Sequence, residues 1–343
     1  MKENIKAGYN KKKFYCKFIK SYCKLFLFLI ILSFLLYYLI SKNKYKFCTN
    51  CIKNINISSI CYKCPNEFLF QGLKIISPEN TIKEIIKYNK SISRFGDGEF
   101  NLIFKNGIRF QEFNQRLSKK LMEVLNSNKK NLLVGILYYP YKKSQQSLYI
   151  KEVVRFFEIW FLKNKFKLLK ILDKKKKYYS TEITRFYFHL KNKSKVPQYI
   201  KKLKKIWNER DVLFVEGEKT RLGIGNDLFN NTKSIKRIIC PAKNSFRVYD
   251  KILNSVLKFD KNILILISLG PTATVLAYDL TLYGYQAIDI GHVDIEYELF
   301  LRKAKKMIQI PLKYVNEYNS GRNENVGKVT DLNYYKQIVY KID

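Results

Sequence analysis

From about residue 75 onward, predominantly apolar runs of the chain alternate with amphipathic segments. Runs rich in Ile, Leu and Val, which are typical of buried strands, lie at residues 131–137, 211–218, 234–240 and 262–268. Helices are predicted over residues 78–90, over 114–126 and over most of the basic stretch 145–205. Strands that alternate with helices predict a mostly parallel sheet with crossover helices, that is, a Rossmann-like α/β fold.

The segment before this domain has a different pattern. Residues 25–41 contain no charged side chain, and lysines flank them on both sides. This length is at the short end of the roughly 17–25 residues that span a bilayer, so we predict a transmembrane anchor in contact with membrane lipid. The prediction divides the chain into a basic tail (1–24), the anchor (25–41), a cysteine-containing stem (42–74) and a catalytic domain (75–343).

Lysines are more numerous before the predicted anchor than in the stem after it. By the positive-inside rule, this excess predicts a single-pass membrane protein of type II, with its catalytic domain on the far side of the membrane. In a eukaryotic cell that side is the lumen of the Golgi or endoplasmic reticulum. In a bacterium the domain would instead face the cytoplasm, where nucleotide sugars are made.

The predicted stem contains two C-x2-C pairs, formed by Cys48, Cys51, Cys61 and Cys64. Two such pairs are typical of a structural Zn²⁺ site with four thiolate ligands. In an oxidising lumen the same cysteines would form disulfides instead. Both interpretations remain open on the sequence.

The chain has 65 Lys and Arg residues against 28 Asp and Glu residues, which gives a net charge of +37. Such an excess favours anionic partners, but the lysines are spread over the whole chain, as they also are in a compositionally biased protein. A zinc-ribbon membrane protein that binds nucleic acid is therefore only an alternative, and no nucleic-acid partner is expected. The phosphate-loop, HExxH and GxSxG motifs are absent, which disfavours phosphate-loop kinases, zinc proteases and serine hydrolases.

A pair of acidic residues follows the first short extended run, in a segment that reads SRFGDGEF. Asp97 and Glu99 are separated by Gly98 and preceded by Gly96, and the glycines allow the backbone to curl into a loop. Two carboxylates placed in this way can bind Mg²⁺ or Mn²⁺, which takes its remaining ligands from water and substrate phosphates. Arg94 could then bind a phosphate oxygen. An ordinary polar turn is the alternative interpretation.

A second candidate site lies where the apolar run at 262–268 leads through Gly270 into a predicted helix. The free N–H groups at the start of a helix bind anions, and open α/β sheets bind ligands at the carboxyl edge of their strands. We therefore predict that Gly270 and Thr272 contact the phosphates of a donor nucleotide.

His292 and Asp294 follow the next predicted strand. A histidine at the end of a strand can be a general base or a metal ligand, and Asp294 could deprotonate an acceptor hydroxyl. The alternative for Asp294 is that it caps the following helix.

A third polar loop follows the strand at 211–218. Its candidate residues are Glu218, a third possible base, and Arg221, Asn226 and Asp227, which we predict to cover a nucleotide or sugar. The loop contains glycines but does not match the dinucleotide-binding fingerprint, because the third glycine is missing.

Four blocks of the chain together resemble a known family: residues 94–99 (RFGDGE), 216–229 (EGEKTRLGIGNDLF), 234–244 (SIKRIICPAKN) and 269–299 (LGPTATVLAYDLTLYGYQAIDIGHVDIEYEL). In sequence and in order they are similar to the GT-D fold glycosyltransferases. The resemblance implies an Asp-x-Glu motif, here Asp97 and Glu99, that holds a divalent metal and a UDP-sugar. It also implies that the later blocks line the donor and acceptor pocket. It covers roughly residues 75–325, apart from the basic stretch 145–205.

We therefore predict a metal-dependent hexosyltransferase that moves a sugar from a UDP-sugar to a hydroxyl of a glycan or glycoprotein. The metal would be Mn²⁺ or Mg²⁺, and the candidate bases, in order, are Asp294, His292 and Glu218. A catalytically inactive relative that only binds glycans is the remaining alternative.

Overall fold

The computed structural model describes residue 70 and residues 72–137, 146–321 and 325–343. The chain divides into two units, residues 1–69 and residues 70–343, and all described residues belong to the second. The predicted basic tail, the anchor and the cysteines of the predicted zinc site therefore lie outside the described residues.

In the ranges that the structure describes, no helix combines the length and the apolar character needed to cross a membrane. This finding contradicts the predicted localisation as a single-pass membrane protein, and contact with membrane lipid is likewise unsupported. We withdraw both predictions. The segment on which they rested, residues 25–41, lies outside the described residues.

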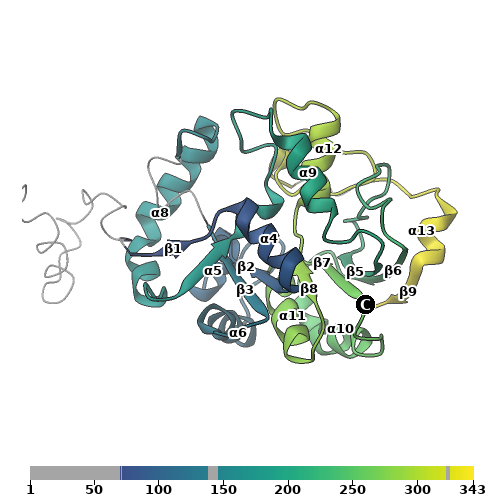
Figure 1. The fold of residues 1–343 in the computed structure, drawn as a ribbon, viewed down its shortest axis with the longest axis horizontal. Helices are drawn as coiled ribbons and strands as arrows, with labels where there is room; N and C mark the ends of the chain where they lie inside the picture. The colour runs from purple at the N-terminus through teal and green to yellow at the C-terminus, as the bar shows by residue number, and fades with distance from the viewer. Residues whose placement is uncertain (1–69, 71, 138–145, 322–324) are drawn as a thin grey trace, which may run out of the picture. The chain divides into compact units, whose positions relative to one another are not determined.

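The described residues form one nine-stranded sheet with helices between its strands (Figure 1). The strands are β1 (Lys74–Ile75), β2 (Ser91–Arg94), β3 (Leu132–Ile136), β4 (Lys177–Ser180), β5 (Asp211–Gly217), β6 (Ser234–Cys240), β7 (Leu264–Ser268), β8 (Ala287–Asp289) and β9 (Ile338–Lys341). The helices are α4 (Pro78–Tyr88), α5 (Asp97–Ile103), α6 (Gln115–Asn126), α8 (Lys151–Ile171), α9 (Val196–Lys204), α10 (Tyr249–Val256), α11 (Pro271–Leu282), α12 (Val293–Leu301) and α13 (Leu332–Gln337), with short 3₁₀ turns η2 (Thr181–Thr184), η3 (Ser245–Val248) and η4 (Tyr318–Gly321).

The strand order is β1-β4-β3-β2-β8-β7-β5-β6-β9, and each neighbouring pair is parallel. In the centre of the sheet Ile92 pairs with Leu133 on one side and with Ile288 on the other. Figure 1 shows β1 at one end of the sheet and β9 at the other. The predicted parallel α/β sheet is therefore confirmed. The four apolar runs form β3, β5, β6 and β7, whereas β2 and β8, which lie between β3 and β7, are short.

Helices cover both faces of the sheet. Ile92 packs in one core cluster with Ile82 and Ile85 of α4, whereas the hydroxyl of its neighbour Ser93 donates a hydrogen bond to the Thr274 carbonyl of α11, at 2.7 Å. Because successive residues of a strand point to opposite faces, α4 and α11 lie on opposite sides of β2. Burial on both faces also explains why β3, β5 and β7 are largely apolar runs.

Two predicted elements differ from the structure. The stretch 145–205 contains the predicted helices, α8 and α9, but also the strand β4 and the turn η2. The segment after Arg94 was predicted to be a loop, yet α5 begins at Asp97. In the first case pairing with β1 and β3 determines the structure of β4, and in the second a capping box starts α5. Both contacts outweigh the local propensity of the sequence.

Candidate active site

The ends of β2, β8 and β4 bring together side chains that are distant in sequence. Arg94 ends β2, Asp289 ends β8, and the turn η2 follows β4. Since β4, β3, β2 and β8 are adjacent and parallel, their carboxyl ends lie at one edge of the sheet, which is where open α/β sheets bind ligands. We call Asp97, Glu99 and Asp289 the acidic cluster.

The first turn of α5 holds Asp97 and Glu99. Gly96 is the N-cap, and its backbone N–H donates a 2.7 Å hydrogen bond to Oε2 of Glu99, which completes a capping box. Two acidic residues in a first turn are also favoured by the helix dipole. The Asp-x-Glu spacing therefore serves the helix start as well as any ligand, and both carboxylates lie at the carboxyl edge of β2.

Among the described residues, Arg94 pairs with Asp289 of the acidic cluster, but no cation forms an ion pair with Asp97 or Glu99. Burial raises the pKa of Asp97, while the nearby charges of Arg185 and Glu317 lower and raise it respectively. Burial and the negative charge of Asp289 raise the pKa of Glu99 to about 7. Burial also raises the pKa of Asp289, against the effect of Arg94. Carboxyl groups that disfavour their own ionised form are suited to binding a cation.

Within the described ranges, no group of three or more His, Cys, Asp or Glu side chains has the arrangement of a complete metal site. A divalent cation at Asp97 and Glu99 would therefore take most of its ligands from water and substrate oxygens, as Mg²⁺ commonly does. The residues present fit such an open site, because they supply negative charge without a full ligand shell.

Arg94 is occupied by partners inside the protein. Its Nε and Nη2 donate to the backbone oxygen and Oδ1 of Asp289, at 2.7 and 2.8 Å, and its Nη1 donates to the Thr184 hydroxyl, at 2.7 Å. Only 11% of its side chain is exposed. The structure thus gives Arg94 a positioning role towards Asp289, rather than the phosphate contact that the sequence suggested.

Gly291 makes room for this guanidinium. Its φ is +40°, and a Cβ atom at this position would lie 1.9 Å from Nη2 of Arg94. Only glycine fits both the backbone conformation and the space.

Sequence reasoning missed Arg185 and Glu317, which form a second charged group with the predicted His292; we call these three residues the arginine cluster. Arg185 donates to both carboxylate oxygens of Glu317, at 3.0 and 2.5 Å, and Nε2 of His292 lies 3.9 Å from Oε1 of Glu317. Arg185 also lies 3.5 Å from Oε1 of Glu296. Since the charges of Arg185 and Glu317 act on the pKa of Asp97, this cluster adjoins the acidic cluster.

The environment of His292 keeps its imidazole neutral. Burial and the positive charge of Arg185 lower the pKa of His292 below its ordinary value. About one-third of its side chain is exposed, so it can still meet a ligand. The lowered pKa leaves the imidazole free to take a proton but makes it a weaker base than an ordinary histidine, unless a bound anion raises that pKa again.

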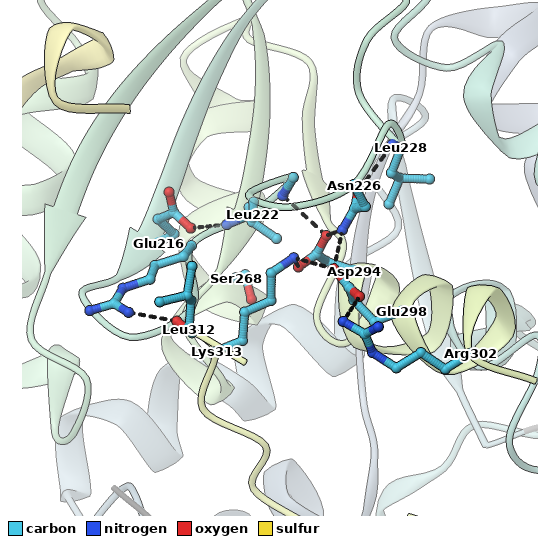
Figure 2. A network of polar contacts seen from close by, with 12 residues as sticks. Glu216, Leu222, Asn226, Leu228, Ser268, Asp294, Glu298, Arg302, Leu312 and Lys313 are labelled. Carbon is cyan, nitrogen blue, oxygen red and sulfur yellow. Dashed lines mark hydrogen bonds and ion pairs between the residues drawn. The ribbon is translucent and has the colours of Figure 1, made fainter. Parts of the chain in front are cut away.

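Asp294, the first candidate base from the sequence, is neutralised inside the protein (Figure 2). Its carboxylate accepts hydrogen bonds from Lys313 Nζ at 2.5 Å, from Asn226 at 2.9 Å and from the Gly223 N–H at 3.0 Å, and 2% of the residue is exposed. Lys313 and Asn226 also bind Glu298. We call Asn226, Asp294, Glu298 and Lys313 the structural network, and its geometry argues against a role for Asp294 as the base.

The remaining loop candidates also have structural partners. Arg221 donates to the backbone oxygens of Leu312 and Gly327, at 2.7 and 2.9 Å, and so fastens the C-terminal segment. Asp227 accepts a 2.6 Å hydrogen bond from the Tyr297 hydroxyl and is largely exposed. Glu218 is exposed just beyond β5. None of these contacts brings the loop to the acidic cluster.

The helix start at Gly270 and Thr272 is covered by an aromatic ring. Gly270 has a φ of +54°, and a Cβ atom there would lie 2.4 Å from the ring of Phe110. Thr272 is fully buried, and its hydroxyl has no hydrogen-bond partner among the described residues. The helix start therefore supports the packing of α11 against β2 and β8, and its donor contact stays a prediction.

Open parallel α/β sheets bind their ligands at the carboxyl edge of the strands, which is where the acidic cluster lies. The chain belongs to the glycosyltransferase GT-D fold family, whose model matches residues 92–318.

Relatives and solved structures agree with this assignment. A Streptococcus gordonii protein named "Probable glycosyl transferase Gly" is 36% identical over 78% of this chain, and GlyD of Streptococcus pneumoniae, named as a glycosyltransferase, is 34% identical over 77% of it. The matches cover 38% and 32% of these relatives, so the chain spans about a third of their length.

Two solved structures of the same fold are similar over their whole length. One, described as the highly conserved domain of unknown function 1792 with a distinct glycosyltransferase fold, has a TM-score of 0.77 and 37% identity and covers 82% of this chain. The other, described as a new glycosyltransferase from Streptococcus sanguinis, has a TM-score of 0.74 and 33% identity and covers 79% of this chain. Glycosyltransferase function is thus supported by family and by structure.

Proposed function

We propose that the protein transfers a sugar from a nucleoside diphosphate sugar, most simply a UDP-sugar, to a hydroxyl of a glycan or glycoprotein. The observation that carries this proposal is the acidic cluster. Asp97, Glu99 and Asp289 lie together at the carboxyl edge, and burial raises the pKa of each. In a family of glycosyltransferases, an edge that attracts a cation is suited to a diphosphate leaving group.

Asp97 and Glu99 would hold Mn²⁺ or Mg²⁺, which would neutralise the charge that develops on the departing diphosphate. Arg94 holds Asp289 in place, and the negative charge of Asp289 acts on Glu99. We assign Asp289 a positioning role, because it acts on the metal through Glu99. Glu99 is itself held by the Gly96 N–H, so one of its oxygens is oriented before any ligand binds.

Arg185 is the cation that we assign to the diphosphate. Both guanidinium groups have carboxylate partners and are mostly buried, with 11% of Arg94 and 15% of Arg185 exposed. Arg185 replaces Arg94 in this role because its partner Glu317 is one-third exposed, whereas the partner of Arg94, Asp289, is buried. A diphosphate could take the place of the Glu317 carboxylate on Arg185. Carboxylate and phosphate groups can each accept two parallel hydrogen bonds from one guanidinium.

His292 is the base that the geometry favours. Its imidazole is neutral and partly exposed, whereas Asp294 is ion-paired and buried. In the proposed reaction His292 takes the proton of the acceptor hydroxyl as the hydroxyl oxygen bonds to the sugar carbon and the diphosphate leaves with the electrons of the broken bond.

The first test is UDP release from a UDP-sugar by the full-length protein, with Mn²⁺ and with a chelator. We expect turnover that requires the metal and that falls roughly a hundredfold or more in Asp97→Asn and in Glu99→Gln, because charge stabilisation of the leaving group is lost. Asp250→Asn is the matched control, since this exposed carboxylate pairs with Arg116 at the surface.

Turnover that survives in a chelator, or that is equal in Asp97→Asn and the parent, would refute the metal site. Metal-dependent binding of the UDP-sugar without any release of UDP would favour the inactive glycan-binding relative instead.

A further inference from the structure

A hollow of about 750 Å³ lies at the edge of the sheet opposite to the acidic cluster. It is lined by Lys90 just before β2, by the loop that leads into Leu132 of β3, and by the lysines at the start of β4. Because these strands are parallel, this is their amino edge. The length of β3 separates it from the candidate active site, which is about 16 Å at 3.3 Å per residue.

The charge of this hollow is of one sign. Six lysines line it, Lys90, Lys129, Lys130, Lys175, Lys176 and Lys177, and no acidic residue does. The whole chain has 65 basic and 28 acidic residues. Most surface patches of this size would therefore still include an acidic residue, so the absence of one here is not explained by the general excess of lysine.

Two of the six lysines already have partners, and they shape the hollow. Lys90 pairs with Glu84 at 2.8 Å. Lys176 donates to the backbone oxygens of Leu125 and Ser127, both at 2.5 Å, and burial lowers its pKa to about 8. Lys176 thereby fastens the loop after α6 to the start of β4, so that two walls of the hollow are fixed to each other.

The other four lysines, Lys129, Lys130, Lys175 and Lys177, are exposed and form no ion pair with any described residue. Lys177 lies over the ring of Tyr179, at 5.4 Å from its centre. Several ammonium groups from two different loops thus surround one space, and lysine binds phosphate oxygens as a point charge.

We propose that this hollow binds a compact soluble anion of sugar size that carries two or more phosphate groups. Its volume is within the range of about 300–1,000 Å³ that small-molecule sites have. The exposed lysines would bind the phosphates, and Tyr88, Tyr179 and the polar side chains of Asn128 and Asn131 would contact the sugar ring and its hydroxyls. This site is separate from the proposed donor site and does not depend on it.

The test is calorimetric titration of the full-length protein with inorganic tripolyphosphate and with glucose bisphosphate, in a chelator so that no metal-dependent donor binding contributes. The variant is Lys129→Gln/Lys130→Gln/Lys175→Gln. The matched control is Lys201→Gln/Lys202→Gln/Lys251→Gln, which removes the same charge from exposed lysines of α9 and α10. All six substitutions are at exposed positions, and a thermal melt checks that both variants fold.

We expect saturable binding of one anion per chain, weakened at least about tenfold in the hollow variant and by less than about twofold in the control, because only the first set contacts the ligand. Equal weakening in both variants would overturn the proposal, since the binding would then reflect overall charge alone. It is also overturned if neither probe saturates, or if a short single-stranded oligonucleotide displaces the probes and binds more tightly.

Discussion

Two groups of charged side chains lie at the same edge of the same sheet, yet they differ in how fully they are neutralised. In the structural network, Asp294 and Glu298 share one buried lysine and one amide, and every carboxylate has a strong partner. In the acidic cluster, burial raises the pKa of Asp97 and Glu99, and no lysine in the described part of the chain pairs with either. Fully paired charges hold a fold together, whereas unpaired ones are available for a ligand.

The largest effect that this comparison predicts is on stability, in the structural network. In Lys313→Met, Asp294 and Glu298 lose their shared cation while they stay buried, so we expect the free energy of unfolding to fall by about 3–5 kcal/mol. Chemical denaturation of the parent and the variant measures it. The matched control is Lys233→Met, whose partner Asp211 is exposed, so that its loss should change the free energy of unfolding far less than the loss of Lys313 does.

If Lys313→Met and Lys233→Met were equally stable, the structural network would not be more tightly bound than a surface pair. The contrast with the acidic cluster would then have no energetic basis.

Much of the fold could be predicted from the sequence, and the reason is local. The strands β3, β5 and β7 are buried on both faces, so their apolar runs are visible without any knowledge of the partners. The short strand β4 was missed, because its four residues lie between α8 and η2 in a lysine-rich stretch.

The candidate site could be predicted only in part. Asp97 and Glu99 stand in one short motif, so the sequence could single them out as candidates. Arg185 and Glu317 come from segments without a motif, and only the fold brings them together. Asp294 was preferred as the base because an acid after a strand resembles a catalytic residue. Its neutralising partner, Lys313, lies 19 positions further along the chain and could not be recognised as such from the sequence.

An intermediate effect is expected from a pair of glycines, one in each region. Gly291→Ala places a methyl group against Arg94 at a φ of +40°, which should cost about 1–3 kcal/mol of unfolding free energy. Displacing Arg94 should also move Asp289 and reduce UDP release about tenfold. Gly225→Ala is the matched control: its φ is +79°, but no atom lies within 4 Å of the added Cβ.

The comparison of these two variants separates backbone strain from the clash with Arg94. Both should lose stability, but only Gly291→Ala should lose activity. A loss of activity in Gly225→Ala as large as that in Gly291→Ala would mean that the loop of the structural network contributes to the site after all.

The smallest effect concerns the pH dependence of metal binding. The pKa of Glu99 is raised from 4.5 to about 7, so in the metal-free protein this carboxyl group is protonated below about pH 7. A cation must displace that proton, and its affinity should therefore fall up to about tenfold for each pH unit below 7 and level off above it. The stability of the metal-free protein depends on pH in the opposite direction. Protonated Glu99 contributes stability below its unfolded pKa, and this contribution is lost as the pH rises from 4.5 to 7.

Titration of Mn²⁺ between about pH 6 and pH 8 measures the pH dependence of the metal affinity. Glu99→Gln should bind the metal weakly but with a flatter pH profile, since the titrating group is gone. A parent profile that is flat across this range would mean that Glu99 is already ionised, and the acidic cluster would then be as well compensated as the structural network.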